Sequence, residues 1–304
     1  MGTTYRVIYF DEPHQRDFKR SVDSLLQDVN KAINTYDPES EISRFNNSEK
    51  GISLKLPYLY DILRKAKRIF NASGGAFDPT VMPLVNAWGF GPAKSDVLSR
   101  KEVDSLKQLV GFERINFNRE RVTKTDSRVQ LDMGGIGQGY GADIIAGFLQ
   151  SKGIRHLLVE LGGEGLACGK NLEKDQPWTI GILDPNSTQD HQFFKAYVKL
   201  RNKAFTTSGN YFNYRIIDGR KIGHTIDPVS GYPVESSLLS VSVFATDCTT
   251  ADAWATAFMV MGIEKAVAMV KKAQGIDALF IYSTEDGNIR THVTRGIEKE
   301  VVLE

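Results

Sequence analysis

The chain is poor in cysteine: among its 304 residues only Cys168 and Cys248 carry a thiol. Two cysteines cannot build a disulfide framework, and no His/Cys pair shows the spacing of zinc ligands. We therefore exclude a disulfide-stapled fold, expect no zinc site, and predict that both thiols act as small buried apolar side chains.

An excess of either charge is also missing, because 38 basic side chains face 37 acidic ones and the formal charge is +1. Without a basic excess, counterion release cannot drive binding to nucleic acid, so we expect no nucleic-acid partner. No run of about 18 apolar residues occurs, which predicts no membrane span. The chain opens on a strand-like segment at residues 3–9, so we expect any secretory leader to be absent or removed.

Linkers rich in Pro, Gly and Ser are missing as well, so we predict a single domain over residues 1–304. Hydrophobic residues make up 41% of the chain, typical of a well-packed core. Helices and strands mix without a regular βαβ repeat, which indicates the α+β class. Helices are predicted at residues 18–36, 57–70, 101–109, 144–149, 249–261 and 264–272, and strands at 3–9, 114–117, 121–125, 129–131, 156–160, 178–183, 196–200, 204–207, 214–217, 239–244 and 278–282.

Two segments fit neither pattern. Residues 40–46 are polar and are expected to be irregular. Residues 76–85 are apolar but contain two prolines and Asp78, which suit neither a plain strand nor a plain helix. We predict a loop there that holds a ligand.

A glycine-rich turn separates the predicted strand at 129–131 from a predicted helix, with glycines at 134, 135, 137 and 139. Glycine lets the backbone approach a ligand closely, and a helix N-terminus offers free N–H groups to a phosphate. Tight packing of the strand on the helix would explain the glycines equally well. Asp132, at the end of the strand, favours a nearby metal or ribose.

Asp252 and Thr256 lie four residues apart in a predicted apolar helix, so their side chains share one face. A carboxylate and a hydroxyl placed in this way can both direct oxygen at Mg²⁺, which takes few protein ligands and keeps positions for water and phosphate. Alternatively, Asp252 favours the helix N-terminus and Thr256 bonds back to a carbonyl.

His224 is the one histidine in a turn-rich segment, followed by Thr225, Ile226, Asp227 and Pro228. It is a candidate general base, or a structural histidine. A Ser-His-Asp hydrolase is disfavoured, because the sequence around Ser208 lacks the G-x-S-x-G pattern.

Eight motifs, in order from Met1 to at least Gly262, together resemble the ApbE family of FAD:protein FMN transferases. They are Tyr36-Asp37-Pro38 with Ser40–Asn46, Gly75–Thr80, Trp88–Gly91, Leu131-Asp132 with the glycine run, Glu160–Gly163, Thr207–Tyr211, His224–Pro228 and Ala251–Thr256.

The resemblance implies an α+β fold with a flavin cleft, a required Mg²⁺ and FAD as substrate. By family pattern the metal ligands are Gly135, Asp252, Ala255 and Thr256, and the catalytic residues are His224 and Asp252. FAD contacts are implied at Met1, Tyr36, Ala76, Phe77, Asp78, Asp132, Gln138 and Ile226. For Tyr36, packing at a helix end is the alternative. Position 138 is often lysine or an acidic residue in the family, so glutamine puts a charged role there in doubt.

The implied reaction moves FMN from FAD to a Thr or Ser hydroxyl of an acceptor flavoprotein subunit and releases AMP. Two alternatives remain open: an FAD pyrophosphatase that uses water as nucleophile, and an FAD-binding protein without turnover. The resemblance also implies a periplasmic or cell-envelope location, with a lipid anchor on the full-length protein.

Overall fold

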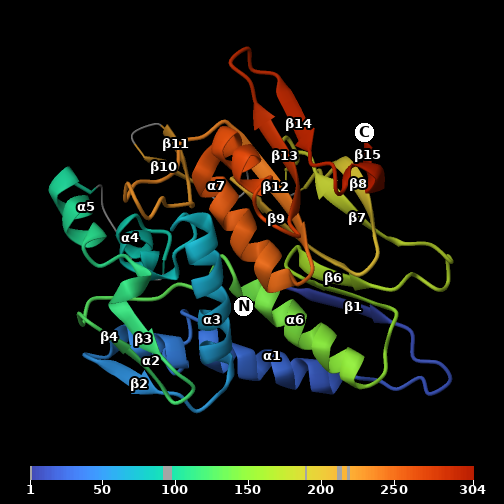
Figure 1. The fold of residues 1–304 in the computed structure, drawn as a ribbon, viewed down its shortest axis with the longest axis horizontal. Helices are drawn as coiled ribbons and strands as arrows, with labels where there is room; N and C mark the ends of the chain where they lie inside the picture. The colour runs from blue at the N-terminus through green and yellow to red at the C-terminus, as the bar shows by residue number, and fades with distance from the viewer. Residues whose placement is uncertain (1, 92–97, 189, 211–213, 218–219) are drawn as a thin grey trace.

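A seven-stranded antiparallel sheet forms the centre of the molecule, with strand order β1-β5-β6-β9-β12-β13-β14 (Figure 1). This is a computed structural model that describes residues 2–91, 98–188, 190–210, 214–217 and 220–304. The seven strands are β1 (Tyr5–Tyr9), β5 (Leu157–Leu161), β6 (Glu164–Cys168), β9 (Lys203–Gly209), β12 (Leu238–Ala245), β13 (Asp277–Ser283) and β14 (Ile289–Val293).

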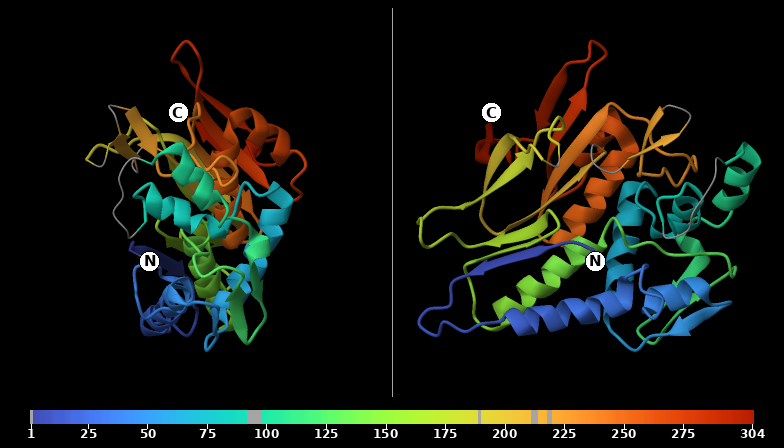
Figure 2. Two further views of the ribbon diagram at one scale, coloured as in Figure 1. Left: turned by 90° about the vertical axis from the view of Figure 1, so that its left-hand side faces the viewer. Right: turned by 180° about the vertical axis from the view of Figure 1, so that it is seen from behind.

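Helices cover one face of this sheet. α6 (Gly137–Ser151) and α7 (Cys248–Val270) pack directly on the strands, and α1 (Lys19–Ile33) and α3 (Tyr58–Ser73) pack on those helices (Figure 2). The largest hydrophobic cluster lies in these layers. A small sheet, ordered β15-β8-β7, covers the opposite face through a second cluster. Its strands are β7 (Trp178–Leu183), β8 (Phe194–Leu200) and β15 (Val301–Leu303).

The remaining elements sit beside the helical layers. A third apolar cluster joins Leu84, Trp88 and Val103 to Ile226, and so holds segments from distant parts of the chain together. These elements are α2 (Glu41–Asn47), the sheet β2-β4-β3 (Gly51–Ser53, Arg121–Lys124, Ile115–Phe117), η1 (Pro79–Val81), α4 (Met82–Ala87), α5 (Arg100–Lys107), η2 (Phe112–Arg114), β10 (Tyr214–Ile217), β11 (Arg220–Gly223) and η3 (Glu298–Glu300).

The mixture of helices with antiparallel sheets confirms the predicted α+β class. The prediction that both cysteines are buried is also confirmed. β2, β6, β11, β14 and β15 were not predicted from the sequence. The helices predicted at 249–261 and 264–272 form one element, α7, which is interrupted at Gly262, where φ is 72° and ψ is 170°.

Among the described residues, α7 is the one helix long and apolar enough to cross a membrane, with a mean hydropathy of 1.4 in its most apolar window. Length and composition alone are weak evidence, because the core helix of a globular domain passes the same test. Here α7 packs on β9, β12 and α6 and carries the buried Asp252. These contacts make it the central helix of the fold.

The expectation that residues 40–46 are irregular is wrong, because they form most of α2. The Ser40 side chain accepts a hydrogen bond from the Ser43 N–H at 3.1 Å and so caps the helix N-terminus. The segment is polar overall, but one side of the helix is buried and includes Ile42 and Phe45.

The predicted strand at 129–131 is also wrong, since no sheet includes these residues. Polar side chains form the hydrogen bonds of their backbone groups instead. Asn46 accepts from the Leu131 N–H at 2.7 Å and donates to the Leu131 carbonyl at 2.9 Å. Lys124 Nζ donates to the Val129 carbonyl at 2.9 Å. An apolar run that predicts a strand therefore lies outside any sheet and is hydrogen-bonded by polar side chains.

The loop predicted at 76–85 is helical in its second half, as η1 and α4. Pro79 and Pro83 both occupy first-turn positions, where a missing N–H costs nothing. Residues 76–78 precede η1, and the Asp78 carboxylate caps it by accepting from the Thr80 N–H at 2.8 Å.

Candidate active site

The N-termini of α6 and α7 meet at Asp252. The Gly139 N–H in the first turn of α6 donates to Asp252 Oδ2 at 2.9 Å, and Asp252 is 4% exposed. A Cβ on Gly139 would lie 2.4 Å from the Cys248 carbonyl oxygen and 2.8 Å from Asp252 Cβ. This glycine is therefore required for the close approach of the two helices, and it packs on a helix rather than on the predicted strand.

Thr256 lies one helical turn beyond Asp252, as the spacing predicted. The Thr256 Oγ1 atom donates to the Gly135 carbonyl at 3.4 Å. A Cβ on Gly135 would lie only 2.5 Å from Thr256 Oγ1. Ala255, between the two ligand candidates in sequence, is buried in α7. The structure thus places Thr256 against Gly135 of the glycine-rich turn, one helical turn from Asp252.

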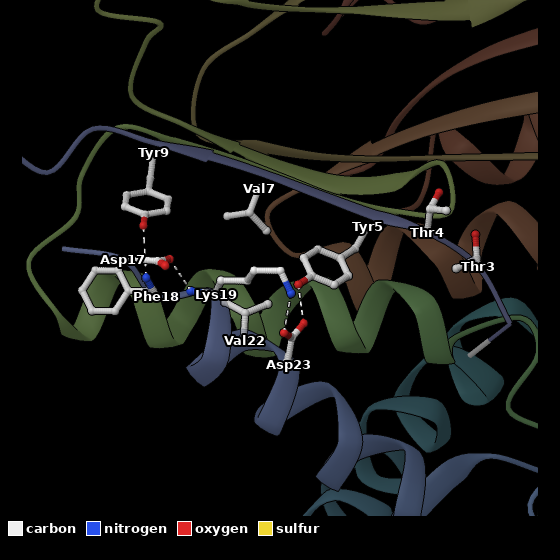
Figure 3. Close-up of a pocket in the computed structure, with 10 residues that line it drawn as sticks. All are labelled: Thr3, Thr4, Tyr5, Val7, Tyr9, Asp17, Phe18, Lys19, Val22 and Asp23. Atoms are coloured by element: carbon white, nitrogen blue, oxygen red, sulfur yellow. Dashed lines mark hydrogen bonds and ion pairs between the residues drawn. The ribbon is translucent and has the colours of Figure 1, made fainter. Parts of the chain in front are cut away.

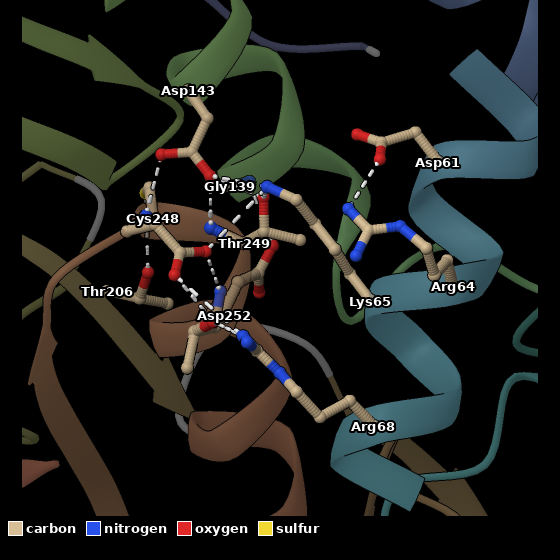
Figure 4. Close-up of polar contacts among 12 residues, drawn as sticks. Asp61, Arg64, Lys65, Arg68, Gly139, Asp143, Thr206, Cys248, Thr249 and Asp252 are labelled. Carbon is tan, nitrogen blue, oxygen red and sulfur yellow. Dashed lines mark hydrogen bonds and ion pairs between the residues drawn. The ribbon is translucent and has the colours of Figure 1, made fainter. Parts of the chain in front are cut away.

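Asp143 of α6 makes the reciprocal contact to α7 (Figure 4). Its carboxylate accepts from the Cys248 N–H at 2.8 Å and the Thr249 N–H at 2.9 Å. Lys65 of α3 approaches it at 3.5 Å. Each helix therefore places a carboxylate at the N-terminus of the other, where the helix dipole favours negative charge. Asp143 was not predicted as a functional residue from the sequence, although a carboxylate within an apolar helix is a usable signal.

Carboxylates at this junction titrate abnormally. Burial raises the pKa of Asp252 to about 7, against the lowering effect of the Gly139 N–H. Burial, and then the proximity of Asp252, raise the pKa of Glu164 at the start of β6. Loss of solvation thus disfavours negative charge on both groups unless a cation balances it.

Mg²⁺ fits this arrangement. Asp252, Thr256 and the Gly135 carbonyl offer hard oxygen donors, the type this ion prefers. A buried oxygen of Glu164 has no hydrogen-bond partner in the described part of the chain, as expected beside a site completed by a bound group. The described residues contain no cluster of three His, Cys, Asp or Glu able to hold a metal.

The flavin-contact candidates Asp78 and Asp132 come from neighbouring segments. The Asp132 N–H donates to the Pro79 carbonyl at 2.7 Å, so the glycine-rich turn lies against the segment that holds Asp78. Burial raises the pKa of Asp132, while the Gly134 N–H and the nearby His224 lower it. The structure therefore brings His224 close to Asp132, although 92 positions separate them in the chain.

The other predicted flavin contacts differ in exposure. The side chains of Phe77 and Ile226 are 3% and 5% exposed and belong to the hydrophobic clusters. Gln138 is half-buried and contacts the turn at Gly162: a Cβ there would lie 2.2 Å from Gln138 Nε2. Tyr36 is 69% exposed, and Met1 lies outside the described residues.

Two surface hollows flank these elements. One, of about 430 Å³, is lined by the predicted flavin contact Ala76 together with Asp227, Val260 and Met261, and so lies beside the 76–78 segment and α7. The other, of about 600 Å³, lies between β1 and α1 (Figure 3). Of the predicted site residues that the structure describes, none lines the hollow between β1 and α1.

Asp78 should make folding stability depend on pH. Burial raises its pKa from 3.8 to about 6, despite hydrogen bonds from Thr80. As pH rises from about 4 to about 6 the unfolded chain loses this proton before the folded chain does, so stability should fall by about 3 kcal/mol. Asp78→Asn should remove this loss, and its stability relative to the parent should increase between pH 4.5 and pH 7 in urea denaturation. Parallel pH curves for the two proteins would contradict the assignment.

Tyr36 should contact the flavin nucleotide, as the family resemblance implies, because its ring is exposed and belongs to none of the hydrophobic clusters of the described residues. Tyr36→Ala should raise the FAD dissociation constant roughly 5- to 150-fold, the range of 1–3 kcal/mol for stacking on a base. The melting temperature of the FAD-free protein should hardly change, and Tyr36→Phe, which keeps the ring, should bind FAD normally. A lower melting temperature with unchanged affinity would instead indicate a packing role.

Known proteins share both the sequence and the fold. Residues 1–280 match the ApbE family. An FAD:protein FMN transferase of Vibrio cholerae is 37% identical over 294 residues, covering 94% of this chain and 86% of the relative. That of Escherichia coli K12 is 32% identical over 313 residues, covering 100% and 88%.

Solved structures of flavin transferases have the same fold as this chain. The flavin transferase ApbE from Vibrio cholerae superposes with a TM-score of 0.87 at 34% identity, covering 99% of this chain and 96% of that one. The apo form of the Pseudomonas stutzeri flavinyl transferase ApbE gives 0.87 at 32% identity, covering 99% and 94%. With its sequence matched over residues 1–280 and its fold matched over almost its whole length, the chain belongs to the ApbE family.

Proposed function

We propose that the protein is a Mg²⁺-dependent FAD:protein FMN transferase, which attaches FMN to a Thr or Ser hydroxyl of an acceptor protein and releases AMP. The observation that carries this proposal is the junction of α6 and α7, where Asp252 and Thr256 share one helix face beside the Gly135 carbonyl. The names of the V. cholerae and E. coli relatives support the choice of FAD and of a protein acceptor.

In this reaction the acceptor hydroxyl attacks the phosphorus on the riboflavin side of the FAD pyrophosphate. The bond from that phosphorus to the bridging oxygen breaks, AMP departs with the bridging oxygen, and a phosphoester joins FMN to the acceptor. Such transfers depend mainly on positioning and on charge neutralisation around phosphorus. Mg²⁺ held by Asp252 and Thr256 would neutralise charge on the phosphate oxygens.

The remaining steps are assigned to this chain's own residues. His224 would accept the proton of the attacking hydroxyl, or orient that hydroxyl, from its place near Asp132. Tyr36 and the 76–78 segment would hold the flavin nucleotide. Gln138 can donate and accept hydrogen bonds but carries no charge.

One experiment separates this function from its alternatives. The protein is incubated with FAD and Mg²⁺, with and without a candidate acceptor. Flavin fluorescence on the acceptor in a denaturing gel indicates transfer, free FMN and AMP indicate a pyrophosphatase, and unchanged FAD indicates a binding protein. Transfer that persists at full rate in excess EDTA would contradict the metal dependence. The cell-envelope location and the lipid anchor stay predictions from the family resemblance.

A further inference from the structure

Glu164 is a buried carboxylate that the proposed reaction does not yet use. It opens β6, directly after the Gly162-Gly163 turn that contacts Gln138, and it is 7% exposed. Its Oε2 atom has no hydrogen-bond partner in the described part of the chain. No ion pair among the described residues includes Glu164.

Two other carboxylates with little exposure, those of Asp143 and Glu41, have compensating partners. Asp143 accepts two backbone N–H groups and has Lys65 within 3.5 Å. Glu41 Oε2 also has no hydrogen-bond partner in the described part of the chain. Its other carboxylate oxygen, Oε1, accepts hydrogen bonds from two backbone N–H groups and lies 3.9 Å from the Arg44 guanidinium. A buried carboxylate without such partners costs several kcal/mol, so a protein that retains one needs a compensating group.

The neighbour of Glu164 identifies that group. Glu164 interacts electrostatically with Asp252, on α7, which contacts β6. Asp252 is itself buried. Among the described residues it accepts a hydrogen bond from the uncharged Gly139 N–H and takes part in no ion pair. Two neighbouring buried carboxylates therefore have no ion pair with a basic side chain of the described residues. A divalent cation would balance both.

We infer that Glu164 is the second acidic group of the magnesium site: Asp252 contacts the ion, and Glu164 Oε2 accepts a hydrogen bond from a water bound to it. Mg²⁺ usually keeps several waters, and groups that hold such waters orient and strengthen the site. The inference rests on the proposed function for the presence of the metal, but it is tested without flavin transfer.

The first test measures binding of Mn²⁺, used as a paramagnetic probe for Mg²⁺, by electron paramagnetic resonance with and without saturating FAD. Glu164→Gln should weaken Mn²⁺ binding about 10- to 100-fold, the usual effect of losing an outer partner of a metal site. Glu160→Gln is the matched control, because Glu160 lies four residues earlier, on the neighbouring strand, and is half-buried. It should bind Mn²⁺ like the parent.

The second test distinguishes a metal role from a structural one by thermal melting. Without divalent ions, Glu164→Gln should melt at the same or a higher temperature, because an amide of similar shape replaces a buried carboxyl group that has no cationic partner. The rise in melting temperature on adding Mg²⁺ should shrink in the variant.

Equal Mn²⁺ affinity in Glu164→Gln and the parent would overturn the inference and leave the proposed function intact. A lower melting temperature without divalent ions, combined with an unchanged Mg²⁺ response, would overturn it in favour of a purely structural glutamate. Failure of the parent protein to bind Mn²⁺ with or without FAD would remove both the inference and the metal dependence of the proposed function.

Discussion

Asp252→Asn should lower the rate of flavin transfer on the order of 10³-fold or more, comparable to removing a main electrostatic contact to the transition state. The amide retains an oxygen that can accept the Gly139 N–H, so the cap on α6 survives. What is lost is the negative charge that attracts Mg²⁺ to the reacting phosphate. The measurement is the rate of acceptor flavinylation at saturating FAD over a range of Mg²⁺ concentrations.

Thr256 offers a graded comparison. Thr256→Ser keeps the hydroxyl beside the Gly135 carbonyl and should transfer flavin at a near-normal rate. Thr256→Ala should require more Mg²⁺ without losing activity at saturation. The circular dichroism spectrum and melting temperature of Asp252→Asn should stay close to those of the parent. A normal transfer rate in a folded Asp252→Asn protein would show that the metal assignment is wrong.

His224→Ala should reduce transfer on the order of 10²–10⁴-fold, the usual loss when a general base is removed. FAD and Mg²⁺ should still bind, because the proposed contacts to both lie mainly on other elements. If chemistry limits turnover, the rate of the parent should rise with pH along a limb that the variant lacks. Single-turnover flavinylation between pH 5 and pH 9 provides the measurement.

His224→Gln separates two roles for this side chain. Glutamine can orient a hydroxyl by hydrogen bonding but cannot take its proton. If His224 is the base, Gln and Ala should be equally slow, whereas recovery with Gln would indicate an orienting role. A variant that binds FAD poorly but reacts normally at saturation would show that His224 only holds the cofactor. Loss of folding would identify it as a structural histidine.

Helices and strands with a clear hydrophobic periodicity could be predicted from the sequence. The helix beginning near Cys248 is apolar almost throughout and contains a carboxylate and a hydroxyl four residues apart, so the spacing alone placed Asp252 and Thr256 on one face. Antiparallel strands such as β5, β7 and β12 carry strong apolar or alternating patterns and were located to within one or two residues. Resemblance to a family supplied what spacing could not, namely the flavin and the roles of Tyr36 and His224.

The predictions were wrong for segments whose conformation depends on hydrogen bonds from side chains. Residues 129–131 have the apolar pattern of a strand, but the Asn46 side chain takes the backbone groups of Leu131 that a neighbouring strand would pair with. Residues 40–46 are polar and form a helix because Ser40 caps it and its apolar residues reach the core. In both cases a side chain, and not the periodicity of the segment, decides the backbone conformation.

The sequence by itself determined the α+β class, the helix face that carries Asp252 and Thr256, and the glycines needed for a close approach. Only the tertiary structure decided which distant segments lie side by side. The N-termini of α6 and α7 meet, and Asp143 and Asp252 each accept hydrogen bonds from the first turn of the other helix. Glu164, on strand β6, lies near Asp252. Helix periodicity acts over one turn and can be read locally. Burial and charge at a site depend on segments far apart in the chain, which only the folded packing brings together.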